Sequence, residues 1–371
     1  MIKIAFIFGT RPEAIKMAPI INLAKKDKAI KPLIISSGQH KEMLDQTLSI
    51  FKIKPDFDLK IMKRNQTLSE ITSRIIKKID PLLNEKKPDL VLVQGDTSTA
   101  FVGALASFYN QIPVGHIEAG LRSFDKKNPF PEEINRKIIS SIADIHFAPT
   151  IASKNNLINE GIKKSEIFKV GNTVIDALKI ITKQVSKFSR KEINQLDLSG
   201  KIILVTTHRR ENLGKPIKNI VNAINQLTNI NNDIKIILPM HPNPKIRETL
   251  VEGLSKNRQV YLTEPLDYTD FVLLMNKSYL IITDSGGVQE EAPTLGTPVL
   301  VTRETTERSE GVKAGTAIMV GTEKEKIVNT AKKLLNNKEN YQKMARKKNP
   351  YGDGKTSSRI IKIIKMRYGK R

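Results

Sequence analysis

Residues that could do chemistry gather directly after the apolar strand candidates of this 371-residue chain. These segments are Gly9–Glu13, Ser36–His40, Gly95–Thr97 and Glu118–Arg122 in the first half, and His208–Asn212, His241–Pro244 and Asp284–Gly287 in the second. Four of the five histidines lie in or beside them. Ligands of open α/β sheets bind beyond the carboxyl ends of the strands. The pattern therefore predicts binding and catalysis at these strand ends.

Two of these segments carry a carboxylate with more than one interpretation. Asp96 could act on a substrate or serve as the N-cap of a helix over Thr99–Tyr109. Glu118, at the end of an apolar strand, could be functional or could form a buried ion pair with Arg122. The residues alone leave both alternatives open.

Acidic residues also begin a predicted helix at Glu132–Ser141. Pro131 suits a first helical turn, and Glu132 and Glu133 suit the positive end of the helix dipole. On spacing alone, neither acid is assigned a catalytic role.

Two features indicate an anionic ligand. Arg11 lies at a predicted helix N-terminus, where a cation opposes the dipole unless an anion binds there. Beside it, Thr10 and Glu13 match a structural capping box. The segment Ser285–Gly287 follows a strand and precedes a helix over Val288–Leu295, which is a geometry that cradles phosphate.

Short β-branched runs alternate with amphipathic helical patterns along the whole chain, which is typical of parallel sheets with helices on both faces. The strand candidates are Ile2–Phe8, Lys31–Ile35, Leu90–Gln94, Pro113–Ile117, Ile145–Ala148, Lys201–Thr206, Ile234–Pro239, Val260–Leu262, Tyr279–Thr283 and Pro298–Thr302. The lysine-rich segment Lys179–Ser199 contains no strong strand and separates the halves. We therefore predict an α/β chain of two doubly wound domains facing across a cleft, with the boundary near Val170–Asp176.

Composition limits the function classes. With 0 cysteines the chain has no disulfides, zinc–thiolate sites, iron–sulfur clusters or thiol nucleophiles. His208 and His241 are not spaced as ligands on one helix, so we expect no metal. The uncharged stretch Thr97–Ile117 is too polar to span a membrane, and Met1–Thr10 has no signal-peptide cleavage site. We expect a cytoplasmic protein.

The formal net charge is strongly positive, with 62 Lys and Arg against 38 Asp and Glu. More than half of the excess lies in Lys324–Arg371, where lysines fall on the polar sides of amphipathic helical patterns. Because no nucleic-acid-binding signature accompanies them, we expect no nucleic acid partner. The charge suits anionic small molecules equally well.

Seven segments form an ordered set: Phe8–Lys16, Gln94–Thr97, His116–Arg122, Pro131–Arg136, His208–Asn212, Asp284–Pro293 and Arg303–Arg308. In this order they resemble the non-hydrolysing UDP-N-acetylglucosamine 2-epimerases. The resemblance runs from Ile2 to the Asn349–Gly354 segment and beyond. Each motif alone would be modest evidence, but the ordered set is highly specific.

This resemblance implies a glycosyltransferase-B-like fold of two Rossmann-like domains. The first would span 1–172 and be joined by a C-terminal helix at 357–371, and the second, UDP-binding domain would span 173–356. It also implies a homodimer that interconverts UDP-GlcNAc and UDP-ManNAc for surface polysaccharide or glycan synthesis. No nicotinamide or other cofactor is implied, because UDP itself is retained as an intermediate.

The resemblance also implies the residues that bind the substrate: Arg11, Lys16, His241, Leu266, Phe271, Ser285, Gly286, Gly287, Glu291 and Arg308. Among them the diphosphate falls to Ser285–Gly287, the ribose to Glu291 and the uracil to Pro265–Phe271, where Leu266 replaces a more polar residue of the family. Gln39, His40 and Gln46 lie in a segment that resembles the regulatory UDP-GlcNAc site of bacterial members.

The implied reaction explains why several acids are needed. The C2 proton of an N-acetylhexosamine is not next to a carbonyl, so its removal is coupled to departure of UDP from C1. The product, 2-acetamidoglucal, regains UDP and a proton on the other face of C2. Two faces need two acid/base groups, and the resemblance assigns Asp96, Glu118 and Glu132, with His208 near the diphosphate. Neighbouring carboxylates repel, which raises the proton affinity of at least one.

Other functions stay open. A glycosyltransferase of the same fold would explain the segment Ser285–Glu291, but not three carboxylates in the other domain. A related 2-epimerase would act on a diacetamido uronic acid nucleotide, and a hydrolysing relative would release ManNAc and UDP.

Overall fold

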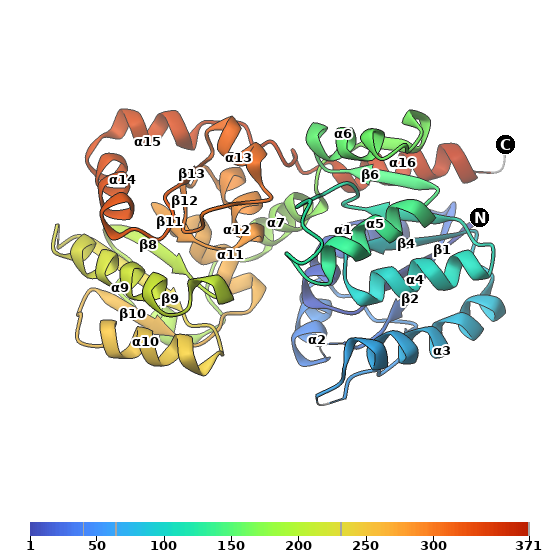
Figure 1. Ribbon diagram of the computed structural model, residues 1–371, viewed down its shortest axis with the longest axis horizontal. Helices are drawn as coiled ribbons and strands as arrows, with labels where there is room; N and C mark the ends of the chain where they lie inside the picture. Colours follow the sequence, from blue (N-terminus) through green and yellow to red (C-terminus); the bar gives the residue numbers. More distant parts are fainter. Residues whose placement is uncertain (40, 64, 231, 370–371) are drawn as a thin grey trace. The chain divides into compact units, whose positions relative to one another are not determined.

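The alternation of apolar strands and amphipathic helices expected from the sequence is present in both halves of the chain (Figure 1). The computed structural model describes every residue except 40, 64, 231 and 370–371. The chain divides into a first unit, Met1–Ala177 with Tyr351–Arg371, and a second unit, Leu178–Pro350. Each unit is built on one parallel sheet.

The first unit has a seven-stranded sheet in the order β3-β2-β1-β4-β5-β6-β7. Its strands are β1 (Ile2–Phe8), β2 (Ile30–Ser36), β3 (Phe57–Asp58), β4 (Leu90–Gln94), β5 (Val114–Ile117), β6 (Ile145–Ala148) and β7 (Ile167–Lys169). The central strands β1 and β4 are apolar except for Lys3 and Gln94 near their ends, because both of their faces are covered by helices.

The helices of the first unit are α1 (Arg11–Lys26), α2 (Lys41–Ile50), α3 (Leu68–Lys86), α4 (Ser98–Tyr109), α5 (Glu132–Ile142), α6 (Ile151–Asn159), the start of α7 (Thr173–Gln184), which continues into the second unit, and α16 (Thr356–Tyr368). One face of the sheet is covered by α3, α4 and α5, which bury Ile75, Val102 and Ile139 against Ile7 of β1. On the other side, α16 packs against α1. The sequence therefore returns to the first unit at its end.

The second unit has a six-stranded sheet in the order β10-β9-β8-β11-β12-β13. Its strands are β8 (Lys201–Thr206), β9 (Ile234–Pro239), β10 (Val260–Thr263), β11 (Leu280–Thr283), β12 (Val299–Val301) and β13 (Ala317–Met319). Its helices are α8 (Lys191–Asn194), α9 (Lys215–Thr228), α10 (Pro244–Leu254), α11 (Tyr268–Lys277), α12 (Gly286–Glu291), α13 (Ser309–Ala314), α14 (Lys324–Asn336) and α15 (Lys338–Ala345). One core joins α9, α10 and α14 to β8 and β9.

The unit boundaries differ from the predicted ones by a few residues. The first unit continues to Ala177 and resumes at Tyr351, whereas the sequence predicted 172 and 357. The Asn172 amide donates to the Tyr351 carbonyl at 2.6 Å, which fastens the returning chain before its helix begins. The Asp176 carboxylate then accepts the amides of Thr356 and Ser357, at 3.2 and 2.8 Å. These contacts cannot be inferred from local sequence patterns.

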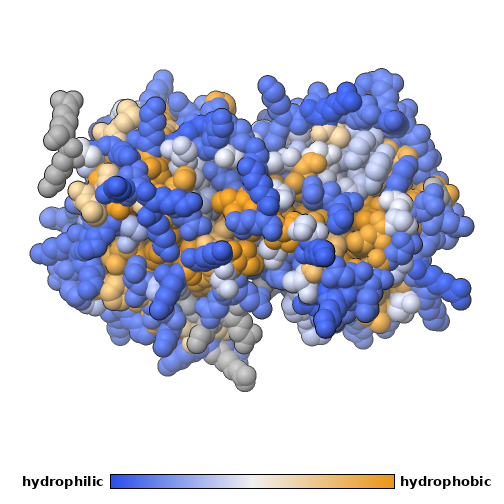
Figure 2. Space-filling view, turned by 180° about the vertical axis from the view of Figure 1, so that it is seen from behind, coloured by the Kyte–Doolittle hydropathy of each residue, from blue (hydrophilic) through white to orange (hydrophobic). Residues whose placement is uncertain are grey.

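Hydrophilic side chains cover most of the face shown in Figure 2. The basic C-terminal segment forms α14, α15 and α16, whose apolar residues, such as Ile327 and Ile360, are buried. Its lysines thus lie on helices with an apolar inner side, as the pattern predicted. None of the described helices is long and apolar enough to cross a membrane.

Candidate active site

Glu118 lies at the end of β5, where it is held by two neighbouring elements. The Gln94 amide at the end of β4 donates to its Oε2 at 2.7 Å, and Lys16 of α1 forms an ion pair with the same oxygen. Glu118 is 7% exposed, and its φ of 66° is in the left-handed region, which is unfavourable for a glutamate. Such strain persists only where surrounding contacts impose it, and it is frequent at functional sites.

The alternative pairing of Glu118 with Arg122 is wrong. The Arg122 guanidinium instead makes two hydrogen bonds to Glu160, at 2.7 and 2.6 Å, and one to Ser140 at 2.9 Å. Glu118 therefore pairs with Lys16, from a distant part of the chain, and both are site residues that the sequence predicted.

Asp96 follows β4 at the same sheet edge, because Gln94 is paired with Ile117 in the β4–β5 ladder. It is not the cap of α4: Thr97 takes that role, and its Oγ1 accepts the Ala100 amide. The Asp96 carboxylate instead accepts a hydrogen bond from Arg136 Nε at 2.7 Å. This excludes the capping interpretation of Asp96.

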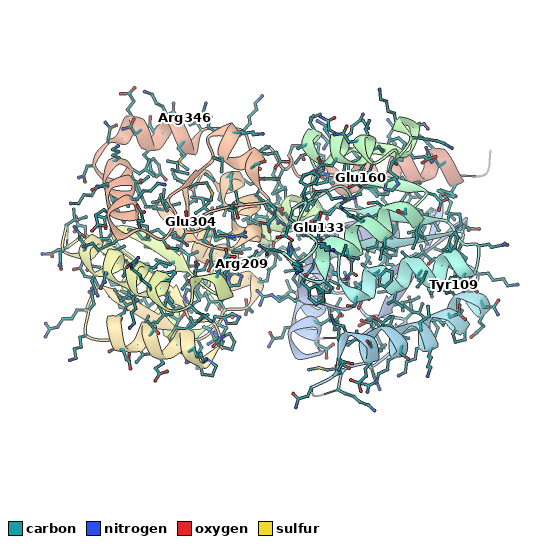
Figure 3. The ribbon with its side chains drawn as sticks, in the orientation of Figure 1. Tyr109, Glu133, Glu160, Arg209, Glu304 and Arg346 are labelled. Atoms are coloured by element: carbon teal, nitrogen blue, oxygen red, sulfur yellow. The ribbon has the colours of Figure 1, made fainter. Side chains whose placement is uncertain are left out.

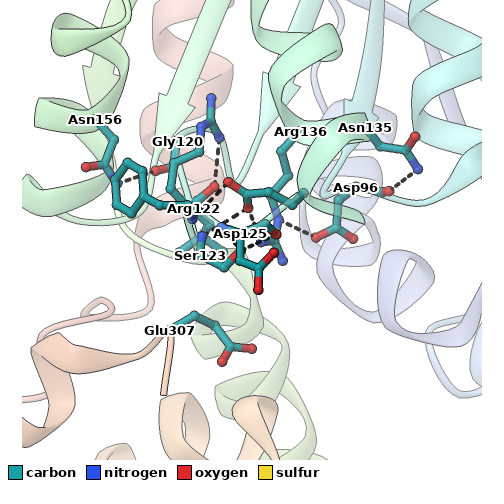
Figure 4. A network of polar contacts seen from close by, with 12 residues as sticks. Asp96, Gly120, Arg122, Ser123, Asp125, Asn135, Arg136, Asn156 and Glu307 are labelled. Carbon is teal, nitrogen blue, oxygen red and sulfur yellow. Dashed lines mark hydrogen bonds and ion pairs between the residues drawn. The ribbon is translucent and has the colours of Figure 1, made fainter. Parts of the chain in front are cut away.

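Glu132 is the first residue of α5. The helix is anchored beside Asp96, because the Asn135 amide donates to the Asp96 carbonyl at 2.8 Å (Figure 4). The Glu132 Oε2 atom is buried and accepts no hydrogen bond from the described residues. A buried, unsatisfied carboxylate oxygen is costly and calls for a functional explanation.

For the next residue, Glu133, the sequence predicted only a favourable interaction with the helix dipole. It is fully buried and accepts the amides of Ser123 and Phe124, at 3.0 and 3.1 Å, and Arg136 Nη1 at 3.1 Å. One sequence feature could have revealed the contact with Arg136: the two residues are three positions apart, which places both side chains on one side of a helix.

Arg11 is the first residue of α1, as predicted, and the capping box of this helix is present. Glu13 accepts the amides of Gly9 and Thr10, and Thr97 Oγ1 donates to it at 2.6 Å. Burial raises the pKa of Glu13 to about 7, against these hydrogen bonds. Glu13 therefore joins the loops that carry Arg11 and Asp96.

In the second unit, His208 follows β8 and its Nδ1 lies 2.8 Å from Asp284 Oδ1. Asp284 also accepts the amides of His208 and Arg209, and the Asn212 side chain. Burial alone would raise the pKa of Asp284, but these contacts, led by His208, hold it below its usual value. Nδ1 of the His208 ring therefore lies toward the carboxylate, and Nε2 lies on the far side of the ring.

His241 lies beside His208, with ring centroids 5.9 Å apart. Burial, followed by repulsion from His208, lowers the pKa of His241, although Asp284 opposes this. The structure thus brings together two histidines that the sequence placed after different strands.

The Ser285–Gly287 turn begins α12, where the first amides have no partner within the helix. Arg308 packs on this turn so closely that a Cβ on Gly286 would lie 3.1 Å from its Cζ. Arg308 is itself oriented by Glu290 and Glu307, at 3.0 and 2.7 Å. A side chain at position 286 would therefore crowd the guanidinium, which would have to shift by a few tenths of an ångström.

Glu291, at the end of α12, accepts a hydrogen bond from the Tyr268 hydroxyl at 2.6 Å. Tyr268 begins α11, two residues after the buried Leu266. Arg190 donates to the carbonyl of the preceding Pro265 at 2.8 Å. The predicted ribose and uracil positions therefore lie on connected elements.

The predicted regulatory residues are only partly placed. Gln39 accepts a hydrogen bond from Thr99 Oγ1 at 3.2 Å, and Gln46 is exposed on α2. His40 lies outside the described residues. Within the described part of the chain, no group of three metal-binding side chains is gathered.

Two doubly wound units, one with three carboxylates and the other with a Ser-Gly-Gly turn beside an oriented arginine, define a nucleotide-sugar enzyme of the glycosyltransferase-B-like class. The family profile described as UDP-N-acetylglucosamine 2-epimerase matches residues 22–365. The UDP-N-acetylglucosamine 2-epimerase of Bacillus subtilis (strain 168) is 50% identical over 370 residues, which cover 100% of this chain and 97% of that protein. The Escherichia coli (strain K12) enzyme is 48% identical, covering 98% of each.

A solved structure gives the same result. The crystal structure of UDP-GlcNAc 2-epimerase from Neisseria meningitidis bound to UDP-GlcNAc has a TM-score of 0.91 and 48% identity, covering 98% of this chain and 99% of that one. The chain belongs to the UDP-N-acetylglucosamine 2-epimerase family.

Proposed function

We propose that the protein interconverts UDP-GlcNAc and UDP-ManNAc by elimination and re-addition of UDP, without a nicotinamide or metal cofactor. The observation that carries this proposal is the gathering of Asp96, Glu118 and Glu132 at one sheet edge through β4, β5 and α5. A sugar transferase would need no such set of proton-transfer groups.

In the forward direction, a carboxylate takes the C2 proton while the C1–O bond to the diphosphate breaks, and UDP leaves with the bonding electrons. The product is 2-acetamidoglucal, with a double bond between C1 and C2. In the second half, another carboxylate donates a proton to the opposite face of C2 as UDP attacks C1. Glu118 and Glu132 differ in their partners, since Lys16 pairs with Glu118 whereas Glu132 keeps a buried unpaired oxygen. This difference suits two groups of opposite duty.

The second unit would hold UDP. The diphosphate would bind the amides of the Ser285–Gly287 turn and Arg308, with His208 and Arg11 stabilising its charge as it leaves. The ribose would bind Glu291, and the uracil would meet the main chain of Leu266 and the side chain of Phe271. His241 would remain uncharged beside His208.

Incubation with UDP-GlcNAc in D₂O, without an acceptor or added NAD, tests the reaction. We expect UDP-ManNAc with deuterium at C2, because the group that removes the proton and the group that restores one are different. Proton NMR measures the reaction over time. Product that keeps its original C2 hydrogen would exclude the elimination route. A transferase would leave the C2 configuration unchanged, and a hydrolysing enzyme would release free ManNAc.

We also propose a homodimer. Phe108 and Tyr109 at the end of α4 are 61% and 64% exposed, and Tyr109 is labelled in Figure 3. Ile134 and Ile138 are exposed on α5. The rings of Phe108 and Tyr109 lie 6.4 Å apart, and exposed aromatic surface of this kind can serve as a protein interface. Sedimentation of Phe108→Lys should show a monomer where the unaltered chain sediments as a dimer.

A second, regulatory UDP-GlcNAc would bind near Gln39. If it does, the unaltered protein should show sigmoidal UDP-GlcNAc kinetics, and Gln39→Ala, His40→Ala or Gln46→Ala should change the sigmoidicity while sparing the chemistry. Hyperbolic kinetics that none of the three replacements alters would remove this site.

A further inference from the structure

Glu133 takes no part in the proposed proton transfers, yet the described structure surrounds it with donors. Its carboxylate is fully buried and accepts the amides of Ser123 and Phe124 together with Arg136 Nη1. Burying a carboxylate is expensive unless its charge and lone pairs are satisfied. An exposed acid would serve the helix dipole equally well, so the dipole does not explain why Glu133 is buried.

Arg136 is shared between two carboxylates. Its Nη1 contacts Glu133 Oε2 at 3.1 Å, and its Nε contacts Asp96 Oδ2 at 2.7 Å (Figure 4). The guanidinium is a rigid planar fork, so fixing one nitrogen fixes the direction in which the other donates. Glu133 is therefore one of the contacts that set how Arg136 presents Nε to Asp96.

Glu133 also holds the loop that follows β5. Phe124 has a φ of 62°, which is a strained backbone conformation for an aromatic residue. Its side chain is 71% exposed, so packing of the side chain does not impose this conformation. The two amide hydrogen bonds to Glu133 are contacts that can hold this turn. One buried carboxylate thus joins the loop, α5 and, through Arg136, the carboxylate after β4.

We propose that Glu133 is a positioning residue for Asp96 that acts through Arg136. This inference rests on the proposed function, in which Asp96 transfers a proton. Without Glu133, Arg136 would lose one of the contacts that orient it, and the Ser123–Phe124 turn would lose two hydrogen bonds. Asp96 would then sit away from its productive position, although the UDP site on the second unit would be untouched.

The test compares Glu133→Gln with Glu160→Gln. In Glu133→Gln at least one of the three donors must face an amide NH₂. Glu160→Gln is the control, because it breaks another carboxylate–arginine pair, with Arg122, without reaching Asp96. For Glu133→Gln we expect kcat to fall about 10- to 100-fold, since small displacements of catalytic groups have effects of this order. Its KM for UDP-GlcNAc and Kd for UDP should stay within about twofold of the unaltered protein, as expected for interactions that matter only in the transition state.

A double-mutant cycle tests the route through Arg136. Arg136→Lys keeps the charge but loses the fork, so Glu133→Gln should lower kcat little further in its presence. Fully additive losses would overturn the route through Arg136. If Glu133→Gln does not fold, as judged by UDP binding and circular dichroism, Glu133→Asp serves instead, because its shorter side chain keeps the charge but cannot reach the same donors.

Three outcomes overturn the inference: an unchanged kcat in a folded variant, a parallel loss of kcat and UDP affinity, or an equal loss of kcat in Glu160→Gln. Failure of the proposed function is distinguishable. In that case the unaltered protein does not epimerise UDP-GlcNAc, or Asp96→Asn retains its turnover. If Asp96→Asn is inactive and Glu133→Gln is fully active, only the inference about Glu133 fails.

Discussion

The two units differ in how the charged side chains of their sites are paired. In the first unit, the acids of the site outnumber their cations: Lys16 pairs with Glu118 and Arg136 with Asp96, while Glu132 keeps an unpaired buried oxygen. In the second unit, arginines are the residues held in place. Arg308 contacts Glu290 and Glu307, and Arg303 contacts Glu307 and Glu211.

This difference separates two tasks. Side chains that must gain and lose protons cannot all be held in ion pairs. Cationic side chains that bind a permanently charged diphosphate work best when they are already oriented. The comparison therefore predicts that changes to the first unit's three carboxylates affect turnover, and that changes to the UDP-binding residues of the second unit affect UDP binding.

The largest effect should come from removing single carboxylates of the first unit. Asp96→Asn, Glu118→Gln and Glu132→Gln should each lower kcat by about 10²–10⁴-fold, the usual contribution of an acid/base group. Isothermal titration should find UDP binding near that of the unaltered protein. Near-normal turnover in all three variants would contradict the proposal that the first unit carries out the proton transfers.

The second effect is an opposite pH dependence of stability in the two units. Burial raises the pKa of Glu13 from 4.5 to about 7, so between these pH values the folded state binds more protons than the unfolded state. The free energy of unfolding of the first unit therefore falls by about 3 kcal/mol as pH rises from 4.5 to 7. Glu307 is the reverse case. Burial would raise its pKa, but Arg308 and Arg303 lower it to about 2, so its contribution of about 3 kcal/mol is present above pH 4.5 and lost towards pH 2.

Hydrogen exchange of peptides from each unit measures both slopes. In Glu13→Gln the first unit should no longer lose protection between pH 4.5 and 7, and the second unit should behave as before. Equal slopes for the altered and unaltered chains would show that Glu13 does not titrate in this range.

A third, smaller effect concerns Arg308, which packs on Gly286. Arg308→Met should weaken UDP binding about 10- to 100-fold, because hydrogen bonds to charged groups contribute about 1.5–3 kcal/mol. Arg303→Met is the matched control, since it loses a contact with the same Glu307. If both variants bind UDP alike, Arg308 acts only by supporting the fold.

The smallest effect should be that of Tyr268→Phe, which removes one hydrogen bond from Glu291. We expect UDP binding to weaken about 2- to 10-fold, as for a neutral donor to a buried acceptor. With 2′-deoxy-UDP the substitution should matter less, because Glu291 would have lost a ribose hydroxyl to bind. An equal effect on both ligands would argue against the ribose assignment.

The sheets were largely predictable from sequence because their central strands are long, apolar and β-branched. The exceptions are β3, β7 and β13, which have two or three residues each and are too short to show a pattern. Positions after strand ends were also predictable, since β4 and β5 bring Asp96 and Glu118 to one edge.

Partners within the site were not predictable. Arg122 is close to Glu118 in sequence, but strand pairing and helix packing bring in Lys16, which is 102 residues away. Adjacent Glu132 and Glu133 looked equivalent because both suit the start of a helix. Their different surroundings come from the loop after β5, whose conformation no local pattern specifies.

The packing of α16 on α1 has a consequence for biosynthesis. The second unit is an insertion within the first, so a growing polypeptide must complete Leu178–Pro350 before the first unit receives its last helix. At about 5–20 residues per second, this delay lasts on the order of ten seconds or more. During it, the surface of α1 that later meets α16 is uncovered, and the nascent first unit can expose apolar side chains to chaperones. The second unit, whose residues are contiguous, can complete its own core first.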